Sequence, residues 1–132
     1  MYRYLVETIE VKAWNVFESN CPSRQIFERI SDRWTGIVLM ALEDGTLRFS
    51  ELKRKVEGVS QKMLTQTLRA LERDGLVSRE VFPTVPVTVE YTLTKLGTSL
   101  LATVQQVRAW AYANIEEIDA ARGEYDRRAL SS

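Results

Sequence analysis

The chain has 132 residues, of which 45% are hydrophobic and 27% are charged, so it fits one small globular domain. It contains no histidine, one cysteine and no apolar run of about 18 residues, which argues against a metal centre, an internal disulfide framework and a membrane span. Its net charge is zero and its first residues lack the pattern of a secretion signal, so we expect a cytoplasmic protein without a cofactor.

The first twenty residues are expected to form an arm outside the main domain. Apolar residues recur at steps of three and four over residues 2–18, which favours an amphipathic helix. Residues 10–13 alternate instead, so an extended conformation is the alternative there. An apolar stripe outside the core needs a cover, and a second subunit is the simplest one. The stripe comprises Tyr2, Leu5, Val6, Ile9, Ala13, Val16 and Phe17.

Two core helices are predicted next. Residues 23–31 form the first helix, with Ser23 as its cap. Residues 32–43 form the second, which is apolar nearly all round and should be the most buried element. We interpret Trp34 as an anchor of the core rather than as a platform for a ligand. The inward-facing residues of the first helix are expected to be Ile26, Phe27 and Ile30.

The segment from Gly58 to Val77 has the pattern of a recognition helix. Ser60 can cap its first turn, and Asp74-Gly75 can end it with a left-handed residue. A shorter helix over residues 48–57, capped by Ser50, precedes it across a glycine-containing turn. Two helices joined in this way form a helix-turn-helix. The inward stripe of the second helix comprises Met63, Leu64, Leu68 and Leu71.

A β-hairpin is predicted after the recognition helix. Residues 76–82 alternate roughly between apolar and polar, and residues 87–93 are rich in β-branched residues. Pro83 and Pro86 interrupt the pattern and place a turn between the strands. A helix-turn-helix followed by such a hairpin is a winged helix. The predicted fold class is therefore mainly α with a small two-stranded β wing (α+β), flanked by N- and C-terminal dimerisation helices.

A long helix is predicted at the C-terminal end. It should be capped by Thr94 and reach Ala121, while the polar residues 122–132 should fray into a flexible tail. So small a domain cannot cover a helix of this length, so its apolar stripe is interpreted as the main dimer seam. Packing within one chain is the alternative. The stripe comprises Leu96, Leu100, Val104, Val107, Ala111, Ile115 and Ile118.

Positive charge is concentrated on the predicted helix-turn-helix and the strand that follows it. Residues 48–79 contain eight basic and four acidic residues, whereas residues 1–47 contain five basic and seven acidic ones. The local field, and not the net charge of the chain, attracts a polyanion such as DNA. The charge distribution therefore favours nucleic acid as a partner of this segment.

The order and spacing of these motifs resemble those of the HxlR family of bacterial transcription regulators. The match covers roughly residues 21–110 and begins with Cys21-Pro22. It implies a homodimeric winged-helix DNA-binding protein, of a family in which some members sense oxidants or electrophiles through cysteine. The wing departs from the family pattern, because Pro86-Val87-Thr88 lacks a basic residue. The runs that carry the resemblance are Asp32–Leu42, Asp44–Leu52, Gly58–Val77 and Val89–Gly97.

We expect four parts: a dimerisation arm (1–20), a winged-helix DNA-binding domain (21–93), a dimerisation helix (94–121) and a tail (122–132). A two-fold dimer places two recognition helices in successive major grooves of double-stranded DNA, about 34 Å apart. The operator should then be an imperfect palindrome. A regulator this small, without a partner-recruiting domain, is expected to repress transcription.

Candidate DNA contacts come from the recognition helix, the helix before it and the wing. Gln and Arg make paired hydrogen bonds to adenine and guanine, so Arg69→Ala should weaken specific binding by about 1–3 kcal/mol if Arg69 reads a base. The basic residues 53–55 and the wing threonines are expected to contact the DNA backbone. The candidates are Ser60, Gln61, Lys62, Thr65, Gln66 and Arg69 on the recognition helix, and Arg48, Lys53, Arg54, Lys55, Thr84 and Thr88 elsewhere.

Cys21 is a candidate redox sensor. It precedes a helix whose dipole stabilises a thiolate, and Arg24 adds positive charge nearby. The family resemblance carries the sensing role onto this position. Because the chain has no other cysteine, oxidation must be resolved by Cys21 of a second subunit or by a small thiol. The alternative is a small residue that packs at the dimer interface.

Three other functions are weighed against this interpretation. An enzyme is disfavoured, because histidine, a phosphate loop and a nucleophile elbow are all absent from the sequence. A winged helix that binds only protein should carry an apolar or acidic recognition face, unlike this one. DNA binding controlled by a small-molecule effector is the third. A pocket between the arm and the long helix would then be lined by Trp14, Phe17, Trp110 and Tyr112.

Overall fold

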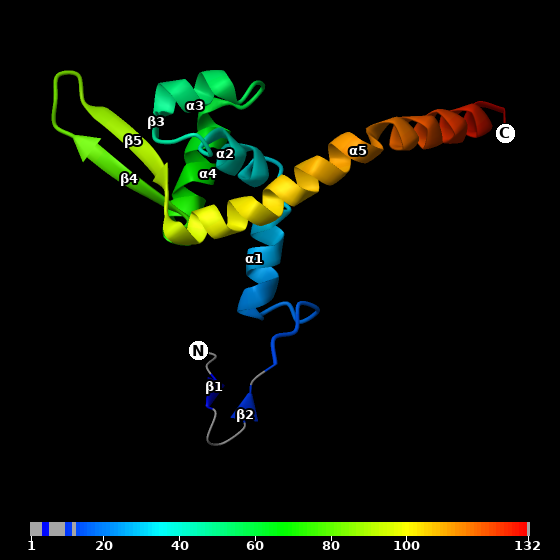
Figure 1. Ribbon diagram of the computed structural model, residues 1–132, viewed down its shortest axis with the longest axis horizontal. Coiled ribbons are helices and arrows are strands. Elements are labelled where there is room, and N and C mark those ends of the chain that lie inside the picture. Colours follow the sequence, from blue (N-terminus) through cyan, green and yellow to red (C-terminus); the bar gives the residue numbers. More distant parts are fainter. Residues whose placement is uncertain (1–3, 6–9, 12, 132) are drawn as a thin grey trace.

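The structure is a computed structural model that describes residues 4–5, 10–11 and 13–131. A helical domain carries a small antiparallel sheet, and one long helix projects from it (Figure 1). Side chains are described from residue 13 onward. The elements in chain order are β1 Tyr4–Leu5, β2 Glu10–Val11, α1 Pro22–Ile30, α2 Thr35–Ala41, β3 Leu47–Arg48, α3 Phe49–Lys55, α4 Gln61–Arg73, β4 Val77–Phe82, β5 Thr88–Leu93 and α5 Lys95–Ser131.

The core of the domain lies where α2, α3, α4 and the start of α5 meet the sheet. Its largest fully buried side chains are aliphatic, and Trp34 is buried with them as predicted. The apolar stripe of α4 supplies the centre of this core, so the recognition helix is seated on the domain along its whole length. The fully buried aliphatic residues are Val38, Leu39, Leu42, Leu52, Val56, Leu64, Leu68, Leu71 and Val77.

The wing is confirmed, and a third strand joins it. β4 and β5 form the antiparallel hairpin, with Val77 opposite Leu93 and Phe82 opposite Thr88. β3 pairs with the other edge of β5, so the strand order is β3-β5-β4. Arg48, the second residue of β3, was predicted as the start of a helix, because a strand that short gives no periodic signal. The third strand fixes the start of α3 against the base of the wing.

The N-terminal arm is not helical where it is described, so the helix predicted over residues 2–18 is wrong. Residues 4–5 pair with residues 10–11 in an antiparallel ladder, and residues 13–20 contain turns but no helix. The sequence of this stretch is rich in β-branched residues, which favour extended backbone. The alternation at residues 10–13 was therefore the better signal. Three residues of the predicted stripe, Tyr2, Val6 and Ile9, lie outside the described residues.

The first and third helices begin one or two residues from their predicted starts. Cys21, and not Ser23, occupies the N-cap of α1, because Pro22 fits the first helical position. Arg48, and not Ser50, is the N-cap of α3, and the carboxylate of Glu51 accepts a hydrogen bond from its backbone N–H at 2.8 Å. A glutamate three residues after the cap that accepts from the N–H of the cap residue is part of a capping box, which favours a helix start at Phe49.

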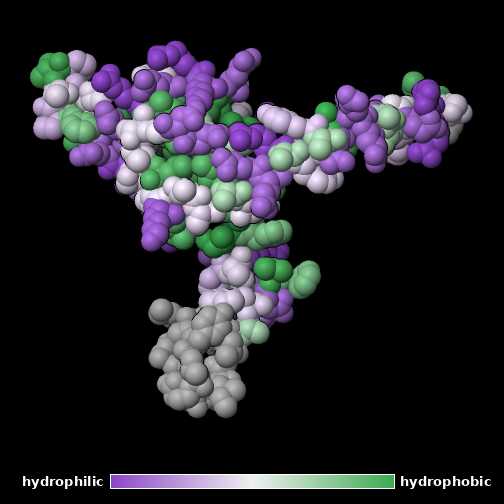
Figure 2. Space-filling model, in the orientation of Figure 1, coloured by the Kyte–Doolittle hydropathy of each residue, from purple (hydrophilic) through white to green (hydrophobic). Residues whose placement is uncertain are grey.

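The apolar residues of α1 were predicted to point inward, and two of them do not. Ile26 and Phe27 are exposed, with 62% of Phe27 accessible, and only Ile30 is half-buried. α1 is amphipathic and lies below the domain with its apolar side uncovered (Figures 1 and 2). The pattern correctly marked an apolar face, but periodicity does not reveal what covers it.

α5 is longer than predicted. Thr94 caps it, because its hydroxyl accepts a hydrogen bond from the Gly97 N–H at 3.0 Å. The helix then runs to Ser131 instead of ending at Ala121. Helix-forming residues, an ion pair between Glu124 and Arg127, and a hydrogen bond from Ser131 to the Arg127 carbonyl support the added turns. At 37 residues, α5 is about 55 Å long and extends well beyond the domain (Figure 1).

Candidate DNA-binding surface

The turn between α3 and α4 is built as a helix-turn-helix requires. Gly58 adopts a φ of +91°, which other residues rarely reach, and Val59 is buried beside it. Ser60 caps α4 through a 3.1 Å hydrogen bond from the Met63 N–H to its hydroxyl. The hydroxyl is therefore committed to the helix start, and Ser60 positions α4 as well as standing at the expected DNA-facing end.

The two faces of α4 differ sharply. Leu64, Thr67, Leu68 and Leu71 are buried, whereas the polar candidates lie on the opposite side. Thr65 is half-buried at the border between the faces. Among the described residues, none of the exposed side chains on this face makes a hydrogen bond or ion pair, so all are free to bind a ligand. These exposed residues are Gln61, Lys62, Gln66, Arg69, Glu72 and Arg73.

A groove of about 280 Å³ separates α4 from the wing. Its floor is apolar and aromatic, and polar and charged side chains of α4 and β4 line its sides. Gln61, Thr65 and Arg69 face this groove, whereas Lys62 and Gln66 are not part of it. The structure thus divides the predicted recognition residues into two rows. The remaining lining residues are Phe49, Glu72, Arg79, Val89 and Tyr91.

The three basic residues of α3 do not behave alike. Lys53 and Arg54 are exposed, and within the described residues neither has a polar partner. Lys55 donates a 2.9 Å hydrogen bond from Nζ to the carbonyl oxygen of Ala41 at the end of α2. This bond holds the Lys55 ammonium at the C-terminus of α2, where the helix dipole favours a cation. Lys55 is therefore not free in the way that Lys53 and Arg54 are.

The wing tip is apolar and internally bonded. Thr84 donates from Oγ1 to the carbonyl of Pro86 at 2.8 Å and lies 3.3 Å from the Thr88 hydroxyl. Val85 is fully exposed at the tip. Arg48 and Thr88 line the same hollow beside Pro86, toward the tip of the wing. Arg48 therefore supplies to this side of the surface the positive charge that the tip itself lacks.

Cys21 lies at the N-terminus of α1 and is buried, with 2% of its surface exposed. Its Sγ is 3.0 Å from the hydroxyl of Ser23. This hydrogen bond is the main cause that lowers the pKa of the thiol below its usual range, while burial acts in the opposite direction. The arrangement stabilises a thiolate, and the burial restricts access to it.

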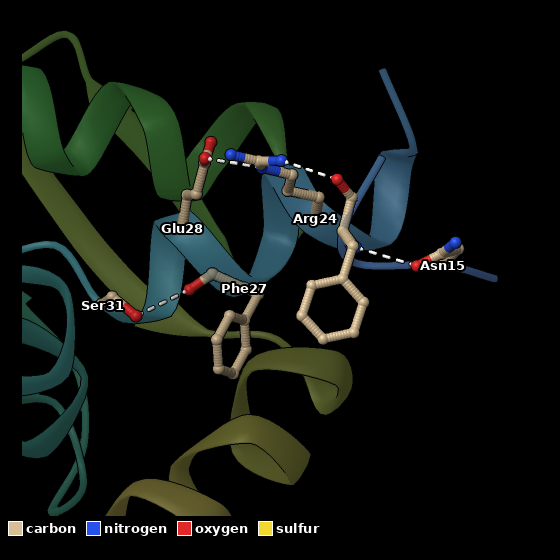
Figure 3. Close-up of polar contacts among 6 residues, drawn as sticks. Asn15, Arg24, Phe27, Glu28 and Ser31 are labelled. Atoms are coloured by element: carbon tan, nitrogen blue, oxygen red, sulfur yellow. Dashed lines mark hydrogen bonds and ion pairs between the residues drawn. The ribbon is translucent and has the colours of Figure 1, made fainter. Parts of the chain in front are cut away.

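Arg24 belongs to a polar network on α1. Its guanidinium donates to the Phe17 carbonyl at 3.1 Å and to the Glu28 carboxylate at 3.2 Å (Figure 3). The ring of Phe27 points to the opposite side of the helix from the Arg24–Glu28 pair (Figure 3). The network holds the loop before Cys21 against α1.

A second, mainly apolar groove of about 340 Å³ lies between α2 and α5. Tyr112 lines it together with Ile37 and Val107. The other aromatic residues proposed for an effector pocket, Trp14, Phe17 and Trp110, are exposed and are not among the residues that line this groove. The predicted aromatic set is therefore not brought together, although an apolar hollow does exist beside Tyr112.

Sequence reasoning missed several residues that organise this surface. Arg79 was counted only as charge, but it lines the groove beside α4. Its position two residues after the buried Val77 on β4 was the available signal, because alternate strand residues share a face. Arg29 also ties α1 to the end of α4 through a 2.9 Å ion pair with Asp74, which no sequence pattern indicated.

The part of the chain that is described holds neither a metal-binding cluster nor a membrane-spanning helix. It contains no cluster of three or more His, Cys, Asp or Glu side chains placed to bind a metal ion. Within the same residues, no helix has the length and apolar character needed to span a bilayer.

Comparison with known proteins identifies the family. The HxlR-like helix-turn-helix family matches residues 29–119. The chain belongs to this family. The HTH-type transcriptional regulator YtfH of Escherichia coli K12 is 44% identical over 115 residues, which are 87% of this chain and 91% of that protein. HxlR-like proteins are DNA-binding transcriptional regulators, which confirms the predicted class and the prediction that the chain is not an enzyme.

Solved structures of HxlR-like relatives have the same fold. The transcriptional regulator ytfH from Salmonella typhimurium superposes with a TM-score of 0.79 at 44% identity, covering 84% of this chain and 99% of that one. The redox regulator HypR in its oxidised form superposes with a TM-score of 0.65 at 41% identity, covering 71% of this chain and 97% of that one. The winged-helix fold class is therefore confirmed.

Proposed function

We propose that this HxlR-like protein is a homodimeric repressor that binds an imperfect palindrome in double-stranded DNA through α4. The main support for the proposal is the pair of exposed side chains Lys62 and Gln66 on α4, which form no hydrogen bond or ion pair with any described residue. The buried leucines of α4 hold the helix in place beneath them. Gln66 fits a bidentate contact to adenine, and Lys62 fits guanine or a nearby phosphate. Lys53 and Arg54 of α3 contact the DNA backbone.

The α5 helix supports the dimer. Beyond the domain it exposes large apolar residues that a soluble monomer rarely leaves uncovered, and Val107 alone is 62% accessible. α1 exposes a second apolar face, which includes Ile26 and Phe27. A dimer interface formed by the apolar faces of α5 and α1 would bury both of them. Trp110, Tyr112 and Ile115 are further exposed apolar residues of α5.

The dimer is tested by substituting the seam. Val107→Glu places a charge on the apolar stripe, so we expect a shift from dimer to monomer in analytical ultracentrifugation. Ala109→Glu adds the same charge to an exposed position two residues away, which faces the other side of α5, and should leave the dimer intact. Equal masses for the two variants would reject α5 as the seam.

DNA recognition is tested by comparing two variants on two duplexes. Gln66→Ala should weaken operator binding by about 1–3 kcal/mol and leave random duplex unaffected, because a base contact carries sequence information. Arg54→Ala should weaken both duplexes equally and lower the salt dependence, because a phosphate contact does not. Repression itself is measured by transcription in vitro from a promoter that overlaps the footprint. Activation of transcription from that promoter would contradict the proposed repressor. A loss of binding to both duplexes in Gln66→Ala, or to the operator alone in Arg54→Ala, would contradict the roles assigned to these residues.

Redox control through Cys21 is part of the proposal. The lowered thiol pKa and the position at a helix N-terminus support it, as does the likeness to the redox regulator HypR. An oxidised Cys21 pairs either with Cys21 of a second subunit or with a small thiol. Diamide should lower the DNA affinity of the wild type and leave Cys21→Ser unchanged. If both proteins bind DNA equally with and without diamide, Cys21 only packs.

Control by a small-molecule effector is the second candidate. The groove between α2 and α5 supports it, because it is mainly apolar and includes Arg33 and Arg108 among its lining residues. An effector that binds there should raise the melting temperature of Cys21→Ser as much as that of the wild type. If DNA binding changes with an oxidant and with no effector, control through the Cys21 thiol is favoured.

A further inference from the structure

The groove between α4 and the wing contains two guanidinium groups from different elements. Arg69 reaches it from α4 and Arg79 from β4. Arg79 lies opposite Tyr91 in the β4–β5 ladder and two residues after the buried Val77. Both neighbours are buried on the face of the sheet that packs against the helices, so the side chain of Arg79 is directed to that face and toward α4.

Neither arginine is neutralised. Within the described part of the chain, Arg69 and Arg79 form no hydrogen bond and no ion pair, although Glu72 lines the same groove. The groove therefore holds two positive charges and one negative charge over an aromatic floor that includes Tyr91 and Phe49. Guanidinium groups match the geometry of phosphate oxygens and bind them bidentately. An anion is the ligand that such a groove favours.

DNA docking brings a phosphate to this place. The major groove that receives α4 is bordered by the two sugar-phosphate backbones. The wing lies beside α4, so a duplex that contacts both must pass one backbone between them (Figure 1). Resting on the function proposed above, we propose that Arg69 and Arg79 together bind a backbone phosphate in each half-site, and that Arg79 is a DNA-binding residue.

This assignment changes the role expected for Arg69. A side chain held between helix and wing contacts the backbone and carries no sequence information, unlike Lys62 and Gln66 on the outer row. Glu72 then opposes binding, because its carboxylate lowers the positive charge of the groove. In this assignment, Arg69 and Arg79 in the groove determine affinity and register, and Lys62 and Gln66 determine which DNA sequence is preferred.

The test compares Arg79→Gln with Arg122→Gln, which removes the same charge from the exposed far part of α5. In a salt series, Arg79→Gln should weaken operator and random duplex by equal factors. It should also lower the slope of log affinity against log salt by about 1 per subunit. Arg122→Gln should leave the slope unchanged. Ethylation of one phosphate per half-site should block the wild type and have a smaller effect on Arg79→Gln, in which only Arg69 can still bind that phosphate.

Two further variants keep the proposal falsifiable if Arg79→Gln does not fold. Arg79→Lys should retain the salt slope, and Glu72→Gln should strengthen binding to both duplexes. The proposal is overturned if the wild type binds DNA but neutralising Arg79 changes neither slope nor ethylation pattern, or if Glu72→Gln fails to strengthen binding. Wild-type protein that binds no duplex would instead reject the proposed function itself, and this inference with it.

Discussion

Gly97 is the glycine whose replacement should cost this fold the most. A Cβ atom at Gly97 would lie 1.9 Å from the carbonyl oxygen of Leu76 and 2.9 Å from its carbonyl carbon. Ordinary contact begins at 3.4 Å, so α5 or the backbone at Leu76 has to move by about 1.5 Å. Both atoms belong to the backbone, so no rotation of a side chain relieves the contact.

The magnitude follows from two opposing effects. Gly97 lies in the first turn of α5, so alanine gains there at most the roughly 1 kcal/mol by which it is favoured over glycine in a helix interior. Overpacking a closed contact costs about 1–3 kcal/mol, or more when the backbone must shift. We expect Gly97→Ala to lower the free energy of unfolding by about 2 kcal/mol, measured by urea denaturation followed by circular dichroism.

Gly123 provides the matched control in the same helix. A Cβ atom there meets nothing within 4 Å, so only the helix propensity changes. Gly123→Ala should therefore leave the protein as stable as the wild type or stabilise it by up to about 1 kcal/mol. The reasoning is refuted if Gly97→Ala is as stable as Gly123→Ala.

Two further predictions concern single hydrogen bonds. Ser60→Ala removes the cap of α4 and should cost about 1 kcal/mol of stability in thermal unfolding, whereas Ser60→Asp, which can cap in the same way, should retain it. Glu43 accepts a 2.9 Å hydrogen bond from Arg108, which holds the pKa of its carboxyl below the ordinary value of 4.5. The stability from this pair is fully present above pH 4.5 and lost as the pH falls through the lowered pKa, so Glu43→Gln should flatten the acid limb of stability against pH. An unchanged acid limb in Glu43→Gln would show that other groups control it.

The helix-turn-helix was predictable because each of its signals is local. Ser60, the leucines of α4 and the glycine after Asp74 each specify one position along the chain, and all agree. Gly75 adopts a φ of +77° at the end of the helix, as its position indicated. The seating of α4 and the identity of its free face followed from these signals alone.

The errors came from segments whose partners are distant or absent. An apolar periodicity marks a face, but it does not say whether the cover comes from the same chain, which is why Phe27 was placed inside and is exposed. The arm has a mixed pattern that fits helix and strand, and the choice of helix over residues 2–18 was wrong where the structure describes them. The groove with Arg79 depends on strand register, which a single sequence does not fix.

Thr94 connects the end of α4 to the start of α5. Its hydroxyl donates to the Gly75 carbonyl at 2.6 Å and accepts from the Gly97 N–H, while its own N–H binds the Leu76 carbonyl at 3.1 Å. Thr94 thus fixes the C-terminal end of α4 to the N-terminal end of α5. In the proposed dimer, exchanging the outward side chains of α4 would change the base pairs that are contacted while keeping the distance between the two half-sites.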